Sequence, residues 1–295
     1  MLYDIGLRIR YAYQTPAAGG RHVLCMTPLD MPGQRAITSL LDVTPEPDER
    51  IARTDFFGNT LVEVAFRAPH AKIEFRLRAR VERQAPEAPA KDVSTPLRLL
   101  AKAIAAVRSL EPDSPHHFLA NSPRVRTTRD FKAFAVKQID MDILTTLQAV
   151  EAIGIAIDRA MTFEPGSTQV NTPPDEAFAR RRGVCQDFSH IMIACLRAIG
   201  IPAAYVSGFL RTNPPEGKAR LEGADAMHAW VRAWCGPETG WIEFDPTNGV
   251  RSNDNHIVVA YGRDYGDVAP VRGVVRISGA QKSSQAVDVV PISEA

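Results

Sequence analysis

Cys185 is the residue of this chain whose type and position best suit nucleophilic chemistry. It follows Gly183-Val184 and begins a segment in which apolar residues recur every three or four positions, the spacing of an amphipathic helix. The unpaired N–H groups and the positive dipole end of a helix start stabilise a thiolate, the reactive form of cysteine. Cys185 also lies on the apolar stripe of this helix, and a buried thiol is usually only a small hydrophobic group. The pattern therefore predicts a candidate nucleophile, and the rest of the chain must supply a base.

The base and a partner acid are predicted on two strands further along the chain. Residues 226–234 and 241–245 have the composition of strands, and the turn 236–240 joins them as an antiparallel hairpin. The hairpin makes His228 and Asp245 neighbours on one sheet face. Taken singly, His228 fits a half-buried strand histidine and Asp245 fits a turn residue. With Cys185 they match a thiol nucleophile, an imidazole base and a carboxylate that holds the imidazole tautomer.

Three stretches of sequence carry a resemblance to a known family. They are GVCQDFSH at 183–190, AMHAW at 226–230 and WIEFDPTNG at 241–249. Two further strings, DFFGN at 55–59 and GRDYGDVAP at 262–270, point to the same proteins, the first of them to an N-terminal β domain. From its first strand to about residue 275, the chain resembles the bacterial transglutaminase-like superfamily.

This resemblance implies a papain-like thiol fold with Cys185 as nucleophile, His228 as base and Asp245 as orienting acid. It leaves the reaction open, because relatives include proteases, amidases and crosslinking acyltransferases. We expect a thiol-dependent hydrolase of peptide or carboxamide bonds that forms a thioester with a peptide or protein substrate. Amine transfer of the transglutaminase type, or peptide modification, is the alternative reaction. A non-catalytic peptide-binding module on the same fold is the alternative outside enzymes.

Three features near Cys185 bear on this chemistry. The Cys185 backbone N–H, at the helix start, is a natural oxyanion donor, whereas the sequence identifies no second donor and Gln186 need not point to the site. The cluster Arg180-Arg181-Arg182 is interpreted as favourable positive charge at a helix C-terminus in preference to a substrate contact. Residues 211–225 form a long connection beside the base, and a substrate-gating loop and a plain surface connection fit it equally.

The remaining histidines are weaker candidates for the site. His190 lies five residues after Cys185, about 140° around the helix, and therefore points away from the thiol. His256 lies at the start of a later strand that can approach the site, but structural packing is the favoured interpretation. Four others lack a carboxylate or thiol context: His22, His70, His116 and His117.

Composition excludes several classes of protein. The chain has 35 basic and 34 acidic residues, a net charge of +1, which indicates neither a nucleic-acid partner nor an anionic membrane surface. Its cysteines, at 25, 185, 195 and 235, are too few for a disulfide framework and lack zinc spacing, so we expect no metal and no cofactor. The first residues read as an alternating strand and no apolar stretch approaches the ~18 residues of a membrane span, which predicts a cytoplasmic protein. The oligomeric state stays open.

The pattern along the chain predicts an α+β protein of two domains. Residues 1–90 form an N-terminal antiparallel β-sandwich, ending in a linker at 84–90. Residues 91–279 form the papain-like core, with helices first and an antiparallel sheet after them. The helices are expected at 96–109, 130–138 and 142–160, and a short one starts near Pro174. Residues 280–295 are polar and weakly patterned, which predicts a C-terminal tail.

Overall fold

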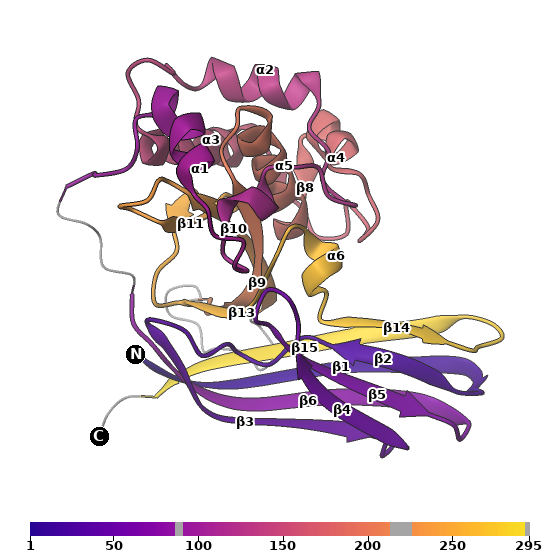
Figure 1. Ribbon diagram of the computed structural model, residues 1–295. Helices are drawn as coiled ribbons and strands as arrows, with labels where there is room; N and C mark the ends of the chain where they lie inside the picture. The colour runs from indigo at the N-terminus through magenta and orange to yellow at the C-terminus, as the bar shows by residue number, and fades with distance from the viewer. Residues whose placement is uncertain (86–90, 213–225, 293–295) are drawn as a thin grey trace, which may run out of the picture.

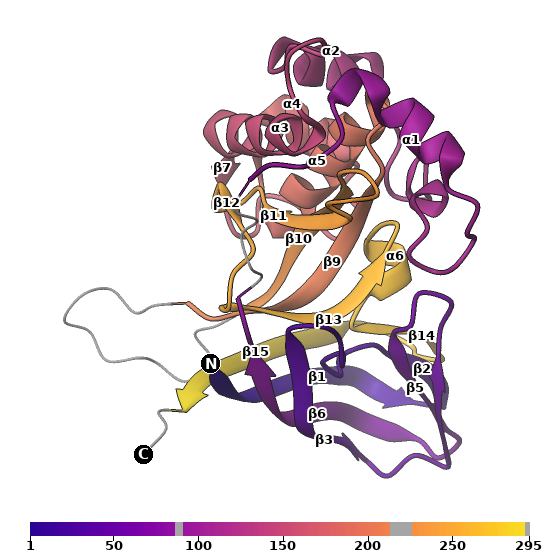
Figure 2. The same ribbon diagram turned by 60° about the vertical axis from the view of Figure 1, so that its left-hand side comes forward.

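The computed structural model describes residues 1–85, 91–212 and 226–292. An N-terminal β-sandwich lies against an α+β body, and the main sheet of the body lies between the sandwich and the helices (Figures 1 and 2). This architecture confirms the predicted α+β class and the order of its parts. Residues 86–90 of the predicted linker at 84–90, and most of the predicted loop at 211–225, lie outside the described residues.

The sandwich is built from two four-stranded antiparallel sheets, with strand orders β15-β1-β6-β3 and β14-β2-β5-β4. Alternation along β1 buries every second side chain, from Tyr3 to Ile9, in a core shared with the facing strands. The strands are β1 Leu2–Ala17, β2 Gly20–Leu24, β3 Gln34–Thr44, β4 Glu49–Thr54, β5 Thr60–Phe66, β6 His70–Arg83, β14 Val271–Val275 and β15 Gln281–Ile292.

The predicted C-terminal tail is wrong, because the end of the chain returns to the sandwich. β15 pairs with β1 along its whole length, from Leu2↔Ile292 to Tyr13↔Gln281. Val287 and Val289 are its buried inward residues, while its first half is exposed and polar. A strand at a sheet margin is stabilised by backbone hydrogen bonds that do not depend on side-chain pattern, so a polar sequence can form it. Without β15, the long strand β1 would be an open edge.

The helical part of the body surrounds the central helix α5. The helices are η1 Leu97–Leu99, α1 Leu100–Ala106, η2 Pro115–Phe118, α2 Arg129–Lys137, α3 Thr146–Ala160, α4 Pro174–Arg180, α5 Cys185–Ala198 and α6 Tyr265–Val268. The third predicted helix begins at Thr146 and not at 142. Thr145 Oγ1 accepts from the Gln148 backbone, and the Gln148 side chain accepts from the Thr145 N–H at 3.1 Å, a capping box that starts the helix there.

The body's main sheet has the strand order β12-β11-β10-β9-β13. The predicted hairpin is confirmed: Trp234 pairs with Trp241 and Val231 with Phe244, and the turn between them closes through Cys235 and Gly240. The strands are β9 Ala203–Leu210, β10 Ala226–Trp234, β11 Trp241–Asp245, β12 Val250–Arg251 and β13 His256–Gly262, with a separate parallel pair of β7 Thr162–Phe163 and β8 Arg182–Gly183.

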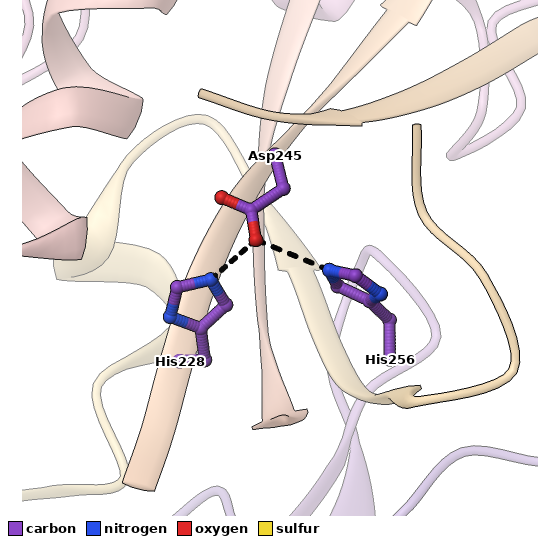
Figure 3. Close-up of side chains that lie close together, drawn as sticks. All are labelled: His228, Asp245 and His256. Carbon is purple, nitrogen blue, oxygen red and sulfur yellow. Dashed lines mark hydrogen bonds and ion pairs between the residues drawn. The ribbon is translucent and has the colours of Figure 1, made fainter. Parts of the chain in front are cut away.

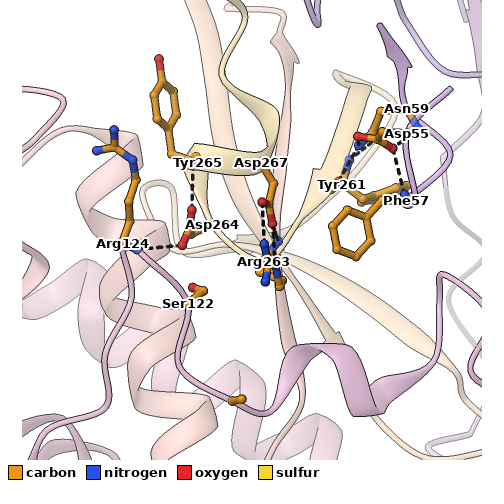
Figure 4. Close-up of polar contacts among 12 residues, drawn as sticks. Asp55, Phe57, Asn59, Ser122, Arg124, Tyr261, Arg263, Asp264, Tyr265 and Asp267 are labelled. Carbon is orange, nitrogen blue, oxygen red and sulfur yellow. Dashed lines mark hydrogen bonds and ion pairs between the residues drawn. The ribbon is translucent and has the colours of Figure 1, made fainter. Parts of the chain in front are cut away.

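Two buried amide side chains of the sandwich hold the edge strand β13. Gln34 accepts from the Val258 N–H and donates to the Val258 carbonyl, both at 2.7 Å. Asn59 forms the same pair of bonds with the Tyr261 backbone, at 2.7 and 2.8 Å, and Asp55 fixes its loop (Figure 4). The amides replace a neighbouring strand and satisfy the open edge of β13. The two domains are therefore joined by directional contacts at the strand that begins with His256.

No helix within the described ranges is both long and apolar enough to cross a membrane.

Candidate active site

Cys185 is the first residue of α5, as predicted, and its side chain is half-buried. The turn before it is held by Asp187, whose Oδ2 accepts from the Val184 N–H at 2.8 Å and from the Thr168 hydroxyl at 2.6 Å. A Cβ at Gly183 would come within 2.7 Å of the Asp187 side chain, so only glycine fits this turn. The local sequence thus places the thiol at the positive end of the helix dipole.

His228, on β10, joins Cys185 to Asp245. Its Nε2 lies 2.7 Å from Asp245 Oδ2 (Figure 3), and it also interacts with the Cys185 thiol. Because Nε2 donates to the carboxylate, Nδ1 is the ring nitrogen left to exchange a proton with sulfur. The three residues predicted from the sequence are therefore brought together in the predicted order.

The electrostatics of the site favour a protonated imidazole. Burial by itself lowers the pKa of His228, but the hydrogen bonds with Asp245 and Cys185 and the charges of both groups raise it to about 10. Burial likewise acts to raise the pKa of Asp245, and its hydrogen bonds to His228 and His256 lower it well below the ordinary value. The pair therefore forms a buried imidazolium–carboxylate next to the Cys185 side chain.

Asp245 is fully buried, and each of its oxygens is satisfied. Oδ1 accepts from the Thr247 N–H at 2.9 Å. Oδ2 accepts from Asn248 at 2.7 Å and from His256 at 3.1 Å, in addition to His228. Four donors, two from the turn that follows Asp245 and two from histidines of neighbouring strands, therefore fix the plane of the carboxylate beside His228.

His256 was interpreted from the sequence as a packing residue, and the structure places it in contact with the acid. Its ring does pack edge-on against Trp230, with centroids 5.1 Å apart, but its Nε2 is bonded to Asp245 (Figure 3). The connection from β12 to β13 must cross the sheet, because these strands form its opposite edges. That crossing brings His256 to Asp245, and the only sequence signal for it is a histidine eleven residues after the acid.

His228, Asp245 and His256 are also the group within the described residues that could hold a metal ion, since their ligand atoms lie within 4.8 Å of one another. The Nε2–Oδ2 separation of 2.7 Å is a direct hydrogen bond. Two ligands on one tetrahedral zinc at ~2.0 Å each would stand farther apart, at roughly 3.3 Å. Proton sharing describes the arrangement better than metal ligation.

The other cysteines lie in different surroundings from Cys185. Cys25, Cys195 and Cys235 are fully buried, and burial raises the pKa of each thiol, to about 12 for Cys25 and Cys235. A neutral buried thiol is inert. All four cysteines are free, and Cys185 is the one that is partly exposed.

The other features noted near Cys185 in the sequence form local contacts. The Nε2 of His190 accepts from the Tyr265 N–H at 3.2 Å, and its ring packs against Tyr205 with centroids 5.2 Å apart. The Gln186 amide donates to the Val170 carbonyl at 3.0 Å. The Arg180–Arg182 cluster ends α4, with Arg181 stacked on Phe178 and the two other arginines paired with glutamates.

A cavity of about 490 Å³ adjoins the Gln186 side of α5 and is lined by Arg124, Val170 and His190, among others. The Arg124 N–H donates to Asp264 at 2.8 Å, and its guanidinium lies 5.5 Å from the Tyr265 ring centre (Figure 4). Burial, and then the charge of Cys185 among others, raises the pKa of Tyr205.

Family models match both parts of the chain. The bacterial transglutaminase-like N-terminal region matches residues 3–82, and the transglutaminase-like superfamily core matches residues 134–246. An uncharacterised protein of Mycobacterium tuberculosis is 33% identical over 306 residues, which cover 98% of this chain and 92% of that protein. An uncharacterised protein of Mycobacterium leprae is 29% identical and covers 96% of each chain. The chain belongs to the transglutaminase-like superfamily, which confirms the resemblance seen in its motifs.

The fold has a solved counterpart along its whole length. The crystal structure of a "putative cysteine protease" from Cytophaga hutchinsonii matches with a TM-score of 0.70 and 22% identity, covering 100% of this chain and 92% of that one. A shorter similarity, 39% identity over 90 residues, links the chain to a protein-glutamine gamma-glutamyltransferase of Pseudomonas aeruginosa and covers 30% of this chain and 13% of that protein. These relatives establish a papain-like, transglutaminase-like fold.

Proposed function

We propose that this protein is a thiol-dependent hydrolase of peptide or carboxamide bonds, with Cys185 as nucleophile, His228 as general base and Asp245 as orienting acid. The proposal rests on the position of His228. Its imidazole ring bonds to the buried carboxylate of Asp245 and interacts with the thiol of Cys185 at the start of α5. Nucleophile, base and orienting group are the parts that acyl transfer through a covalent intermediate requires.

The reaction follows from this order of groups. His228 Nδ1 takes the thiol proton, and the thiolate attacks the carbonyl carbon, which becomes tetrahedral. The Cys185 N–H, in the first turn of α5, donates to the developing oxyanion. The imidazolium then protonates the departing amine, and a thioester remains on Cys185. Water, deprotonated by His228, attacks the thioester and releases the carboxylic acid and the free thiol.

A second candidate is acyl transfer to an amine in place of water. The similarity to the Pseudomonas aeruginosa gamma-glutamyltransferase over 90 residues favours it. Both reactions share every step up to the thioester and differ only in the acceptor. Water is the default acceptor, because no feature within the described residues marks a site for a lysine side chain.

Thiol alkylation across pH tests the shared part of the mechanism. We expect iodoacetamide to modify the wild-type protein below neutral pH, to leave Cys185→Ala unmodified, and to modify Cys195→Ala like the wild type. His228→Ala should delay modification until the pH approaches ~8.5, the value of an ordinary thiol. Wild-type modification that itself begins only near that pH would contradict the proposal and favour a non-catalytic binding module.

The acceptor is decided by a second experiment on a glutamine-containing protein substrate such as casein. Hydrolysis predicts new carboxylates or peptide ends, at a rate that a fluorescent primary amine does not change. Covalent incorporation of that amine without net hydrolysis would assign the chain to the transferases. Both products should be absent with Cys185→Ala.

A further inference from the structure

We infer that His256 is a positioning residue for the candidate triad, holding Asp245 in the plane from which the carboxylate orients His228. The inference rests on the proposed function for its chemistry, because it assigns a role to a residue that does not itself touch the thiol or a substrate.

Both ring nitrogens of His256 have partners. Nδ1 lies 3.2 Å from the backbone N–H of Asn253 and 3.2 Å from the Asn253 side-chain oxygen, so Asn253 holds this side of the ring. Nε2 lies 3.1 Å from Asp245 Oδ2, and because an ionised carboxylate only accepts, His256 donates to it through Nε2.

Both histidines donate to one oxygen of Asp245. Oδ2 receives His228 at 2.7 Å and His256 at 3.1 Å, and the two ring centres are 6.2 Å apart (Figure 3). A carboxylate held by donors on both sides of one oxygen cannot rotate away from the base without breaking a buried hydrogen bond. Removal of His256 leaves Asp245 with Thr247, Asn248 and His228 as partners, and so weakens the hold on the orientation that stabilises the His228 imidazolium.

His256 is itself held by both domains. It is 2% exposed and starts β13, the strand whose backbone Gln34 and Asn59 of the sandwich grip further along. Trp230, against which its ring packs, donates to Glu243 at 2.8 Å, and Glu243 also accepts from Tyr261 at 2.7 Å. The sandwich, which contributes no residue to the candidate site, thus holds β13, and β13 carries the histidine that bonds to Asp245.

Titratable groups reach His256 from several elements. Asp245 on β11 and His228 on β10 face it directly. Asp254 and Tyr3 lie at the turn before it, where the Tyr3 hydroxyl donates to Asn255 at 3.2 Å. The pH dependence of thiol reactivity therefore reports on the Asp245–His228 pair. The role of His256 is isolated by comparing a variant that loses the His256–Asp245 hydrogen bond with a matched variant that keeps it.

Two amide variants differ in this one contact. His256→Gln places an amide N–H near the position of the imidazole Nε2 and keeps a donor for Asp245. His256→Asn is one methylene shorter, ends near the position of Nδ1, and cannot reach the carboxylate. His22→Asn is the control for loss of a buried imidazole elsewhere, since His22 is 6% exposed within the sandwich.

The measurement is the second-order rate of iodoacetamide reaction at Cys185, followed on the intact folded protein near pH 6 and near pH 9.5. We expect His256→Asn to react about tenfold more slowly than the wild type near pH 6, the cost of a lost hydrogen bond to a charged group. Near pH 9.5, where ordinary thiols ionise, it should match the wild type within about twofold. His256→Gln and His22→Asn should stay close to the wild type at both values.

Each contrary outcome has a distinct meaning. Equal rates for His256→Asn and wild type near pH 6 would overturn the inference and leave the proposed function intact. An equal drop at both pH values, or a drop as large for His256→Gln, would assign His256 to packing alone. A wild-type protein that is unreactive near pH 6 would overturn the proposed function first, and the inference with it.

Discussion

The sandwich and the α+β body place their carboxylates in opposite environments. On the sandwich, carboxylates lie on partly or fully exposed strand surfaces and pair there, as Asp42 does with Arg78 at 2.9 Å, whereas Arg83 is a buried cation of this domain. Within the described residues, the buried carboxylates Asp187, Asp245 and Asp264 all lie in the body. Exposed pairs contribute little to stability, whereas a buried charge must be fully partnered or the fold suffers.

Arg197 shows how completely the body satisfies such a group. Its guanidinium is 5% exposed and donates to the carbonyls of Ala120, Ala203 and Arg263 and to the Ser122 hydroxyl, at 2.7 to 3.1 Å. Burial lowers its pKa to about 10, which still leaves it charged near neutrality. This network joins α5 to the segments on either side of it. The comparison teaches that the rigid, polar interior lies where the candidate site is, and the sandwich supports it from outside.

The largest expected effect is on reactivity, from Asp245→Asn. The substitution keeps the size of the side chain but removes the charge and the preferred tautomer of His228, so we expect turnover and low-pH thiol reactivity to fall about 10³- to 10⁴-fold. Asp42→Asn on the sandwich is the matched change at an exposed carboxylate and should leave both unchanged. Retention of more than a tenth of the wild-type rate in Asp245→Asn would remove Asp245 from the mechanism.

The next effect is on stability, from Arg197→Met. The change leaves several buried carbonyls without a donor, and we expect the free energy of unfolding to fall by ~3 kcal/mol or more, as measured by urea denaturation. Arg78→Met on the sandwich should cost under ~1 kcal/mol. Similar losses for the two variants would break the contrast between the domains.

A smaller effect is the pH dependence that His228 gives to stability. Its pKa of about 10 lies above the ~6.5 of an unfolded histidine, so the folded protein keeps a proton that the unfolded chain loses between these values. The stabilisation is complete below about pH 6.5 and is lost as the pH rises towards about 10. We expect the difference in unfolding free energy between wild type and His228→Gln to shrink across that range.

His22 provides the contrasting case in the sandwich. Burial, with a contribution from His70, lowers its pKa to about 4, so it is neutral in both states above about pH 6.5. The corresponding difference for His22→Gln should stay flat from pH 6.5 to 10 in the same urea titrations. A parallel slope for the two variants would show that the effect does not come from the Asp245–His228 pair.

The smallest effect concerns the surface of the sandwich. A double-mutant cycle on Arg78 and Asp42 should give a coupling energy below ~1 kcal/mol that decreases as salt is added. A coupling of ~3 kcal/mol, insensitive to salt, would mean that this surface is as rigidly organised as the interior of the body.

The parts of the fold that depend on local spacing were predictable. The turn 236–240 determines the register of β10 and β11, and the apolar spacing after Cys185 predicts α5, so the three candidate site residues follow from short stretches of sequence. The strand β15 was not predictable in this way. Its first half is polar and exposed, and its pairing with β1 uses backbone groups that every residue carries.

The sequence by itself determined a candidate nucleophile at a helix start, a candidate base and acid on one hairpin, and the family to which these motifs belong. Only the tertiary structure decided that the chain's end completes the sandwich, that Gln34 and Asn59 hold β13, and that His256 shares an oxygen of Asp245 with His228. The physical reason is the range of the interactions. Periodicity and turn chemistry act within a few residues, whereas a buried carboxylate takes its donors from whatever segments the sheet order brings to it.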